Sequence, residues 1–391
     1  MSDIKNGKVS GNIPNDMEIL LKPFADAVND PVAYTKALSE KGKKVIGYVC
    51  SYAPEEIIIA SGAHPFRLFS RRTPISKADK HFQSYCCSLV RGVLEEALNG
   101  RLDHLYGTVF PHTCDSIQRL SDVFRITFNF DFFADAVLPV KLNTKSAIAY
   151  MQDVLDKVKN ELGASMGAAI SDADLLKAIE KVNAKKRLLK RLYELRSEKP
   201  GVLSAKDTYV IVKGTMILDI DEALEALSGL LSALDAAQAE VSAVRRKTLM
   251  LIGGICDHPD IYGMLESTGA DVTWDDLCTG TRYFLAETPI EMGLSPIESL
   301  AKRYAERPVC PAKHQSVNAR GDAMTALVKE KDIDGVIFLY LKFCDPHAFD
   351  YPYLKEMLDK EKIPSLLYEV EDISPSGGQL LTRIETFVDM I

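Results

Sequence analysis

The sequence lacks any apolar run that approaches the ~18–20 residues needed to span a membrane. Its first residues, Met-Ser-Asp-Ile-Lys-Asn-Gly, also lack the apolar core of a signal peptide. The formal net charge of −8 gives no basic excess of the kind that nucleic-acid binders usually carry. We therefore expect a cytoplasmic protein that binds neither a membrane nor nucleic acid.

Three compact chemical motifs are absent as well. There is no Gly-x4-Gly-Lys-Ser/Thr segment and no Gly-x-Gly-x-x-Gly after a predicted strand, so the chain itself is expected neither to hydrolyse ATP nor to bind NAD in the usual way. No Cys-x2-Cys pair occurs, which leaves a structural zinc site poorly supported. In a reducing compartment the eight cysteines are candidates for packing, metal or redox chemistry rather than for disulfides.

What the sequence does contain is an alternation of strands and helices. Short β-branched and aromatic runs alternate with helical stretches, which is typical of parallel sheets covered by helices. A chain of 391 residues is also too long to fold around one hydrophobic core of ordinary size. We expect an N-terminal helical lead-in at 1–43, a first α/β domain at 44–142, a helical segment at 143–248 and a second α/β domain at 249–391.

The two α/β halves resemble each other in order and spacing. Residues 45–55 and 249–260 each read as a strand, a cysteine, a short turn with proline and an acid, and then a helix. Cysteines fall in parallel order, as Cys50, Cys87 and Cys114 in one half and Cys256, Cys310 and Cys344 in the other. Internal duplication predicts two similar Rossmann-like parallel-sheet domains of the α/β class, facing each other across a cleft, with an additional helical segment.

Two buried strands end at the same dipeptide, Cys114-Asp115 and Cys344-Asp345. Ligands of open parallel sheets sit beyond the carboxyl ends of the strands, so these cysteines are candidates for a shared metal or cluster site. Cys86 and Cys87 are neighbours on a predicted helix and point ~100° apart, so only one would face such a site, and Cys87 is favoured. A cysteine nucleophile also stays open, because His112 precedes Cys114 by two residues.

Other candidates have a structural interpretation beside the functional one. Glu55 and Glu56 could act as acid–base groups or could favour the start of a helix, and His112 and His347 suit hydrogen-bonded or surface loops. We expect four cysteines to be buried packing residues: Cys50, Cys256, Cys278 and Cys310. The segment 279–282 could bind an anion weakly. The arginines Arg67, Arg71 and Arg72 are expected to form a surface patch, with a site for the phosphate of CoA as the alternative.

The basic residues of 177–196 are expected to form a solvated helix face, with a docking surface for an acidic partner as the alternative. They are Lys181, Lys185, Lys186, Arg187, Lys190 and Arg191.

Several long stretches resemble the 2-hydroxyacyl-CoA dehydratase and benzoyl-CoA reductase family. They include Lys-Val-Ile-Gly-Tyr-Val-Cys-Ser-Tyr-Ala-Pro-Glu at 44–55, Phe-Pro-His-Thr-Cys-Asp-Ser-Ile-Gln-Arg-Leu-Ser-Asp at 110–122, Asp-Leu-Cys-Thr-Gly-Thr-Arg-Tyr-Phe at 276–284, the run 334–345, and Gly-Gln-Leu-Leu-Thr-Arg-Ile-Glu-Thr-Phe at 378–387. The resemblance runs from about residue 40 to the end. Around Cys114 it is closest to the smaller, cluster-bearing subunit of the benzoyl-CoA reductase type.

The resemblance implies a [4Fe-4S] cluster held by Cys87, Cys114 and Cys344. It further implies an acyl-CoA substrate that receives single low-potential electrons, a homologous second subunit or a second copy of the chain, and a separate ATP-hydrolysing iron–sulfur activator. The enzyme would then be a 2-hydroxyacyl-CoA dehydratase or a benzoyl-CoA reductase. Catalytic residues are not assigned beyond the weak candidates Glu55, Glu56 and His112.

Three alternatives remain. A related branch of ATP-dependent reductases carries a double-cubane [8Fe-9S] cluster, and the six cysteines of the two halves would supply enough thiolates; Pro311-Ala312 departs from the Cys-x-Cys of that branch and favours a single cubane. The chain could instead be a non-catalytic cluster electron relay. A thiol hydrolase using Cys114 with His112 is the third alternative.

Overall fold

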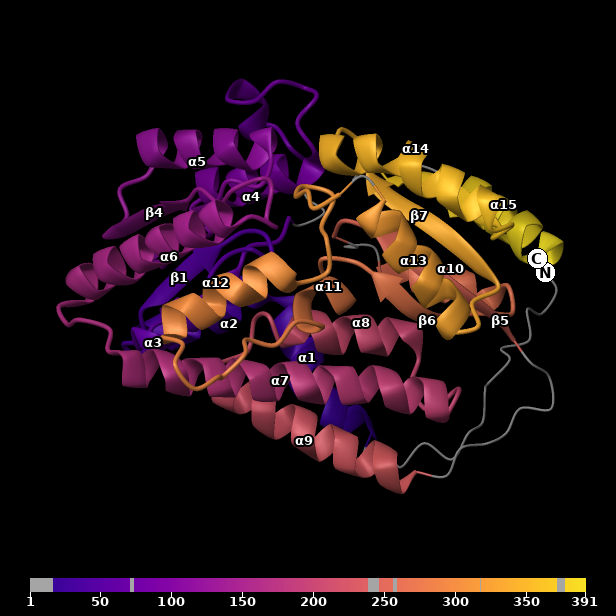
Figure 1. Ribbon diagram of the computed structural model, residues 1–391, viewed down its shortest axis with the longest axis horizontal. Helices are drawn as coiled ribbons and strands as arrows, with labels where there is room; N and C mark the ends of the chain where they lie inside the picture. Colours follow the sequence, from indigo (N-terminus) through magenta and orange to yellow (C-terminus); the bar gives the residue numbers. More distant parts are fainter. Residues whose placement is uncertain (1–16, 71–73, 238–245, 256–258, 317, 371–376) are drawn as a thin grey trace.

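The computed structural model describes residues 17–70, 74–237, 246–255, 259–316, 318–370 and 377–391. Its centre is a pair of four-stranded, fully parallel sheets that lie side by side, each with helices around it (Figure 1). The first sheet contains β1 Val45–Tyr48, β2 His64–Arg67, β3 Gly107–Pro111 and β4 Phe132–Ala136. The second contains β5 Lys247–Gly253, β6 Ala270–Asp276, β7 Gly335–Leu341 and β8 Ser365–Val370.

Both sheets have the same strand order, β2-β1-β3-β4 and β6-β5-β7-β8. The order reverses between β1 and β3 in one sheet and between β5 and β7 in the other, and such switch points open a crevice at the carboxyl ends of the strands. The expected duplicated α/β architecture is therefore confirmed at the level of topology.

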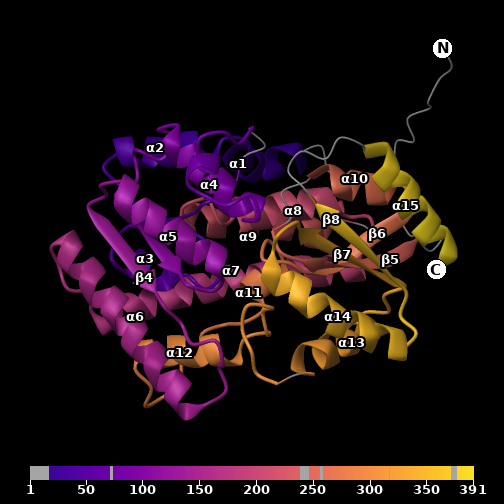
Figure 2. The same ribbon diagram turned by 90° about the horizontal axis from the view of Figure 1, so that it is seen from above.

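Helices follow the strands as the sequence pattern predicts. In the first half they are α3 Glu55–Ala60, α4 Ser88–Leu98 and α5 Asp115–Thr127, with a short 3-10 turn at Ala78–Lys80. In the second half they are α10 Pro259–Ser267, α11 Thr281–Phe284, α12 Pro296–Glu306, α13 Ala319–Glu330, α14 Asp345–Lys360 and α15 Gly377–Met390. Figure 2 shows α5 and α6 on the side of the first sheet and α13, α14 and α15 on the side of the second.

The segment between the sheets is helical, as expected. It contains α6 Lys145–Met166, α7 Asp172–Glu198, α8 Ala205–Gly214 and α9 Ile220–Ala236, and two further helices, α1 Met17–Asn29 and α2 Pro31–Glu40, precede the first sheet. Ser171 caps α7 by accepting a hydrogen bond from the Asp174 amide. Within the expected helical segment, α9 ends at Ala236, and 238–245 lie outside the described residues.

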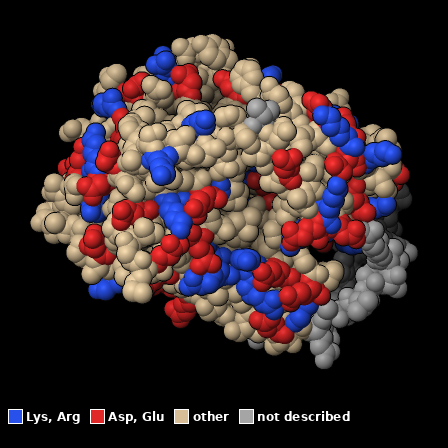
Figure 3. Space-filling model, viewed as in Figure 1, with Lys and Arg blue, Asp and Glu red and all other residues tan. Residues whose placement is uncertain are grey.

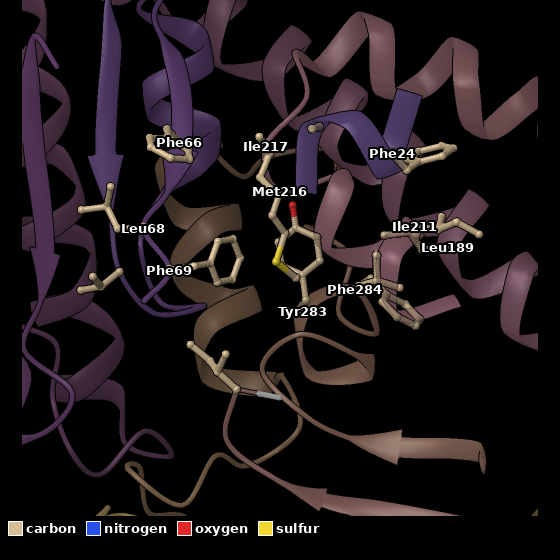
Figure 4. Packing of buried hydrophobic residues seen from close by; sticks show 14 of the residues in the cluster. Phe24, Phe66, Leu68, Phe69, Leu189, Ile211, Met216, Ile217, Tyr283 and Phe284 are labelled. Carbon is tan, nitrogen blue, oxygen red and sulfur yellow. The ribbon is translucent and has the colours of Figure 1, made fainter. Parts of the chain in front are cut away.

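The longest of these helices, α7, joins the two halves. It contacts α3 of the first half and α11 and β6 of the second, and it runs below both sheets in Figure 1. Figure 4 shows the packing at this junction, where Phe66 and Phe69 of the first half, Leu189 of α7 and Phe284 of α11 belong to one apolar cluster. The core is therefore continuous between the sheets and the helical segment.

One part of the second half packs on the first. Leu300 and Tyr304 of α12 share a buried cluster with Ile46 of β1 and Leu155 of α6. A bridge between Lys141 and His314 continues this contact. The domain boundaries at 43, 142 and 248 stay predictions, but the packing shows that residues after 248 complete the core of the first lobe.

Charged side chains on the face shown in Figure 3 are interspersed, with Lys and Arg beside Asp and Glu over most of its described surface. Among the described residues, no helix is both long enough and apolar enough to cross a membrane.

Candidate functional site

All three cysteines predicted as cluster ligands are N-cap residues. Cys87 precedes α4, Cys114 precedes α5 and Cys344 precedes α14. Each helix therefore begins at a thiol, and free amides and the helix dipole favour negative charge at such a position. Cys114 and Cys344 occupy this place because β3 and β7 end just before them, at the switch point of each sheet.

The three thiols line one cavity of about 510 Å³. Cys310 also lines it, although the sequence favoured plain packing for this residue; it is buried as expected but faces the cavity as well. Cys86, which is next to Cys87, is buried outside the lining. The preference for Cys87 over Cys86 therefore agrees with the lining of the cavity, while ligand binding itself stays a prediction.

The thiols of this cavity influence one another. Burial raises the pKa of Cys114 to about 12, and the neighbouring Cys87 thiol adds to the rise. Burial likewise raises the pKa of Cys344 well above its ordinary value, with contributions from Cys87 and Cys114. In the metal-free protein these groups are neutral thiols, and a metal would have to displace their protons on binding.

Within the described ranges, no three His, Cys, Asp or Glu side chains converge closely enough to hold a single metal ion. The thiols therefore line a cavity and do not converge on the position of one ion. Such an arrangement suits a polynuclear group, in which each cysteine binds a different iron, better than one mononuclear ion.

Arg320 and Asp350 of the second half line the cavity, and both belong to a buried charge cluster with Asp276 and Arg282, which do not line it. Asp276 lies between Arg282 and Arg320, and Arg320 also pairs with Asp350 at 2.7 Å. Burial alone would raise the pKa of Asp276, but the two guanidinium groups outweigh it and hold the pKa below its usual value. This part of the lining is therefore fixed by charged groups that neutralise one another.

The two histidines near the Cys-Asp dipeptides have different partners. His112 Nε2 lies 2.8 Å from Asp135 Oδ1 on β4, so the described part of the chain shows His112 turned to its own sheet rather than to the Cys114 thiol. His347 Nδ1 instead lies 3.1 Å from Cys344 Sγ. His347 is buried, and burial lowers its pKa well below the usual value, with Arg282 adding to the fall. A hydrogen-bonded role is thus found for both, and a surface position is wrong for His347.

Glu55 and Glu56 make buried ion pairs away from the cavity. Lys185 Nζ lies 3.2 Å from Glu55, and Glu56 pairs with Lys186 at 3.5 Å and with Arg303 at 3.0 Å. Neither glutamate lines the cavity. The expectation of a solvated basic face is wrong for Lys185 and Lys186, because α3 packs on α7 and brings two acids to them from 130 residues away.

The expected surface patch at Arg67 is also wrong, while Arg71 and Arg72 lie outside the described residues. Arg67 is fully buried and its Nη1 donates to the Cys278 carbonyl at 2.9 Å. In the segment 279–282, the Thr281 amide donates to Asp275 and the Gly280 amide to the Leu277 carbonyl, so these two amides are not offered to a ligand.

Of the remaining cysteines, Cys50 follows β1 with a φ of 67°, an unusual value for a residue with a side chain, and its Sγ accepts from Thr113 Oγ1 at 3.5 Å. Cys278 is half-buried, and Cys256 lies outside the described residues. Among the cavity residues that the sequence did not single out are the charged residues Lys313, Arg320 and Asp350. None belongs to a recognisable spacing, so only the fold brings them to the thiols.

Comparison with known proteins shows which family the chain matches. Residues 50–391 match the family described as 2-hydroxyglutaryl-CoA dehydratase, D-component. The chain is 28% identical to the (R)-phenyllactyl-CoA dehydratase beta subunit of Clostridium sporogenes over 369 residues, which is 94% of this chain and 97% of that protein. It is 25% identical to one of the subunits of benzoyl-CoA reductase from Thauera aromatica, covering 90% and 92% of the two chains.

The beta subunit of (R)-2-hydroxyglutaryl-CoA dehydratase from Acidaminococcus fermentans is also 25% identical, over 95% of this chain and 99% of that protein. Dehydratase and ring-reductase relatives thus match at similar identity and nearly full length, so identity alone does not separate the two branches. Because the family match covers most of the sequence and includes Cys87, Cys114, Cys310 and Cys344, the chain belongs to the 2-hydroxyglutaryl-CoA dehydratase, D-component family.

Proposed function

We propose that this chain is the [4Fe-4S]-containing subunit of an ATP-dependent acyl-CoA radical enzyme, with Cys87, Cys114 and Cys344 as cluster ligands. The observation that carries the proposal is that three thiols from separate helix starts line one cavity at the switch points of two duplicated sheets. When bound, the cluster would supply one-electron chemistry, which no side chain of the cavity offers.

The chain's own residues would hold and shield that group. Three N-cap positions would present the thiolates, His347 would contact Cys344, and the Asp276–Arg320 pair would keep the Arg320 side of the cavity rigid. The cavity is of the size of a small-molecule site, ~300–1,000 Å³, so space for part of a thioester beside a cluster is reasonable.

The partners follow from the same proposal. Relatives are named as beta subunits of dehydratases or as one of the subunits of benzoyl-CoA reductase. We therefore propose a homologous second subunit or a second copy of the chain, an acyl-CoA substrate and a separate ATP-hydrolysing iron–sulfur activator. Thiols that must stay reduced favour the cytoplasm as the location. Of the six thiols needed for an [8Fe-9S] cluster, Cys50 lies outside the cavity lining, which favours a single cubane.

The first test compares two adjacent cysteines. Anaerobically reconstituted protein should be brown and contain about four irons per chain. Cys87→Ser should abolish iron binding, whereas Cys86→Ser, the matched control, should retain it. A colourless wild-type protein after careful reconstitution would contradict the proposal.

The second test separates an enzyme subunit from an electron relay. An acyl-CoA ester should perturb the visible or paramagnetic spectrum of the cluster if its thioester enters the cavity. No change with either a 2-hydroxyacyl-CoA or benzoyl-CoA, in the presence of the partner subunit, would favour the relay.

A further inference from the structure

Three buried cations have no carboxylate partner among the described residues. Arg67 Nη1 donates to the Cys278 carbonyl, Arg307 Nη1 donates to the Ser51 carbonyl at 2.6 Å, and Lys313 Nζ donates to the Leu138 carbonyl at 3.1 Å. Other buried cations, such as Lys186, pair with an acid. Burying a charge without an opposite charge is costly, so three such groups in one molecule call for a source of negative charge.

All three cations lie beside cysteines. Arg67 binds the carbonyl of Cys278, and Arg307 binds the residue that follows Cys50. Lys313 is three residues beyond Cys310 and is the one member of this group that lines the cysteine cavity. Positive charge without a carboxylate partner is therefore concentrated around the thiols.

Lys313 interacts electrostatically with thiols rather than with acids. Burial lowers the pKa of Lys313, and ionisation of Cys50, Cys310 and Cys114, as on binding a metal group, would oppose that fall. The side chain is only 4% exposed, so water does little to screen it. An anionic group in the cavity would supply the counter-charge that no carboxylate of the described residues gives to Lys313.

We propose that Lys313 supplies the counter-charge of the cluster–thiolate group and raises the potential at which that group accepts an electron. The proposal rests on the proposed function. The step is a one-electron reduction in which no bond forms or breaks, and the electron comes from an external reductant. The reduced group carries one more negative charge than the oxidised group, so a nearby ammonium stabilises the reduced form more.

The expected size follows from Coulomb's law. One unit charge about 10 Å from a redox centre, at an effective dielectric constant of about 20, changes the ratio of reduced to oxidised centres by roughly tenfold. Removing the charge of Lys313 should therefore lower that ratio by about this factor at a fixed ambient potential.

The test is an anaerobic redox titration of the reconstituted full chain with Ti(III) citrate, followed by visible absorbance and paramagnetic resonance. Lys313→Arg keeps the charge, Lys313→Gln keeps a hydrogen-bond donor for Leu138, and Lys313→Met keeps neither. Lys141→Gln is the matched control, because Lys141 is exposed and its backbone bridges to His314 beside the cavity. We expect the Gln and Met variants to need a stronger reductant, and the Arg and Lys141 variants to match the wild type.

Each result has a definite meaning. A shift in the Met variant alone would show that the hydrogen bond to Leu138 matters rather than the charge, and would overturn the proposal. Cluster loss in both neutral variants, with retention in Lys313→Arg, would support it. Identical titrations for all variants that hold iron would overturn this proposal alone, whereas a wild type without iron would overturn the proposed function too.

Discussion

Cys114 and Cys344 occupy equivalent places in the two sheets, since each follows the third strand of its half and caps the next helix. Their surroundings differ. Near Cys114 the local histidine, His112, faces Asp135, whereas near Cys344 His347 contacts the thiol and Arg282 approaches the far side of its ring. The duplicated backbone has thus kept the position of the thiols, while the charged groups around them have diverged.

Buried carboxylates provide a second comparison between the halves, although they occupy different places in the two folds. Each half buries one carboxylate between two cations: Glu56 between Lys186 and Arg303, and Asp276 between Arg282 and Arg320. The cations of Glu56 come from α7 and α12, so this cluster ties the first half to the rest of the molecule. Those of Asp276 come from the second half, and one of them, Arg320, lines the cavity.

The largest expected effect tests whether the two cysteines that follow β3 and β7 contribute equally to iron binding. Cys114→Ser and Cys344→Ser should each abolish iron retention, because a serine hydroxyl does not replace a thiolate that the cubane requires. Iron content and visible absorbance after anaerobic reconstitution measure this. Cys50→Ser is the control and should keep its iron. If only one of the two variants loses the cluster, the halves do not contribute equally; loss in Cys50→Ser would favour the double-cubane alternative.

The buried carboxylates should show the next largest effect. Glu56→Gln leaves Lys186 and Arg303 without their acid, and Asp276→Asn leaves Arg282 without one while Arg320 keeps Asp350. Each change should lower the free energy of unfolding by about 3–5 kcal/mol, with Glu56→Gln the larger. Urea unfolding of the metal-free protein checks the stability. Only Asp276→Asn should also weaken iron retention, since Arg320 lines the cavity and no partner of Glu56 does.

The control for this pair is an exposed ion pair. Glu361→Gln removes the partner of Lys329 on the surface and should leave the unfolding free energy nearly unchanged. Equal losses from Glu361→Gln and Glu56→Gln would mean that burial does not set the strength of these pairs.

The sequence predicts the parts of this comparison that depend on local pattern. Strand ends, helix starts and the positions of Cys114 and Cys344 follow from apolar runs and from the residues that flank them. The expected helix at Cys86 and Cys87 is wrong, because α4 begins at Ser88 and Cys87 is its extended N-cap residue. Burial of Lys185 and Lys186 could not be predicted in this way, because their acids lie on α3 and only tertiary packing brings the helices together. The place of Lys313 in the cavity could not be predicted for the same reason, because a single lysine in a loop belongs to no recognisable sequence pattern.

Replacing the histidines should have a smaller effect on iron retention, and only the histidine of the second half should show it. His347→Asn removes the ring nitrogen that lies 3.1 Å from Cys344 Sγ, and loss of such an outer contact typically weakens metal retention roughly 10–100-fold. The rate at which a chelator removes iron measures it. His112→Asn should retain iron like the wild type because its ring faces Asp135. Faster loss in His112→Asn would instead place that ring at the Cys114 thiol.

The smallest effect concerns the first residues of the edge strands, His64 in β2 and Ala270 in β6. Burial lowers the pKa of His64 from 6.5 to about 4, so between these pH values the unfolded chain binds a proton that the folded chain does not. Acidification through this range therefore favours unfolding, and His64 should contribute up to about 1.4 kcal/mol per pH unit to the loss of stability. His64→Gln removes this contribution and makes the strand start non-titrating, as Ala270 is in the other sheet. The difference in unfolding free energy between variant and wild type should then be constant above pH 7 and shift in favour of the variant from pH 6.5 towards pH 4. Because the other histidines titrate in both proteins, subtracting the two unfolding free energies at each pH isolates the contribution of His64. If the two curves of unfolding free energy against pH are parallel over the whole range, His64 does not make the stability of the first sheet depend on pH.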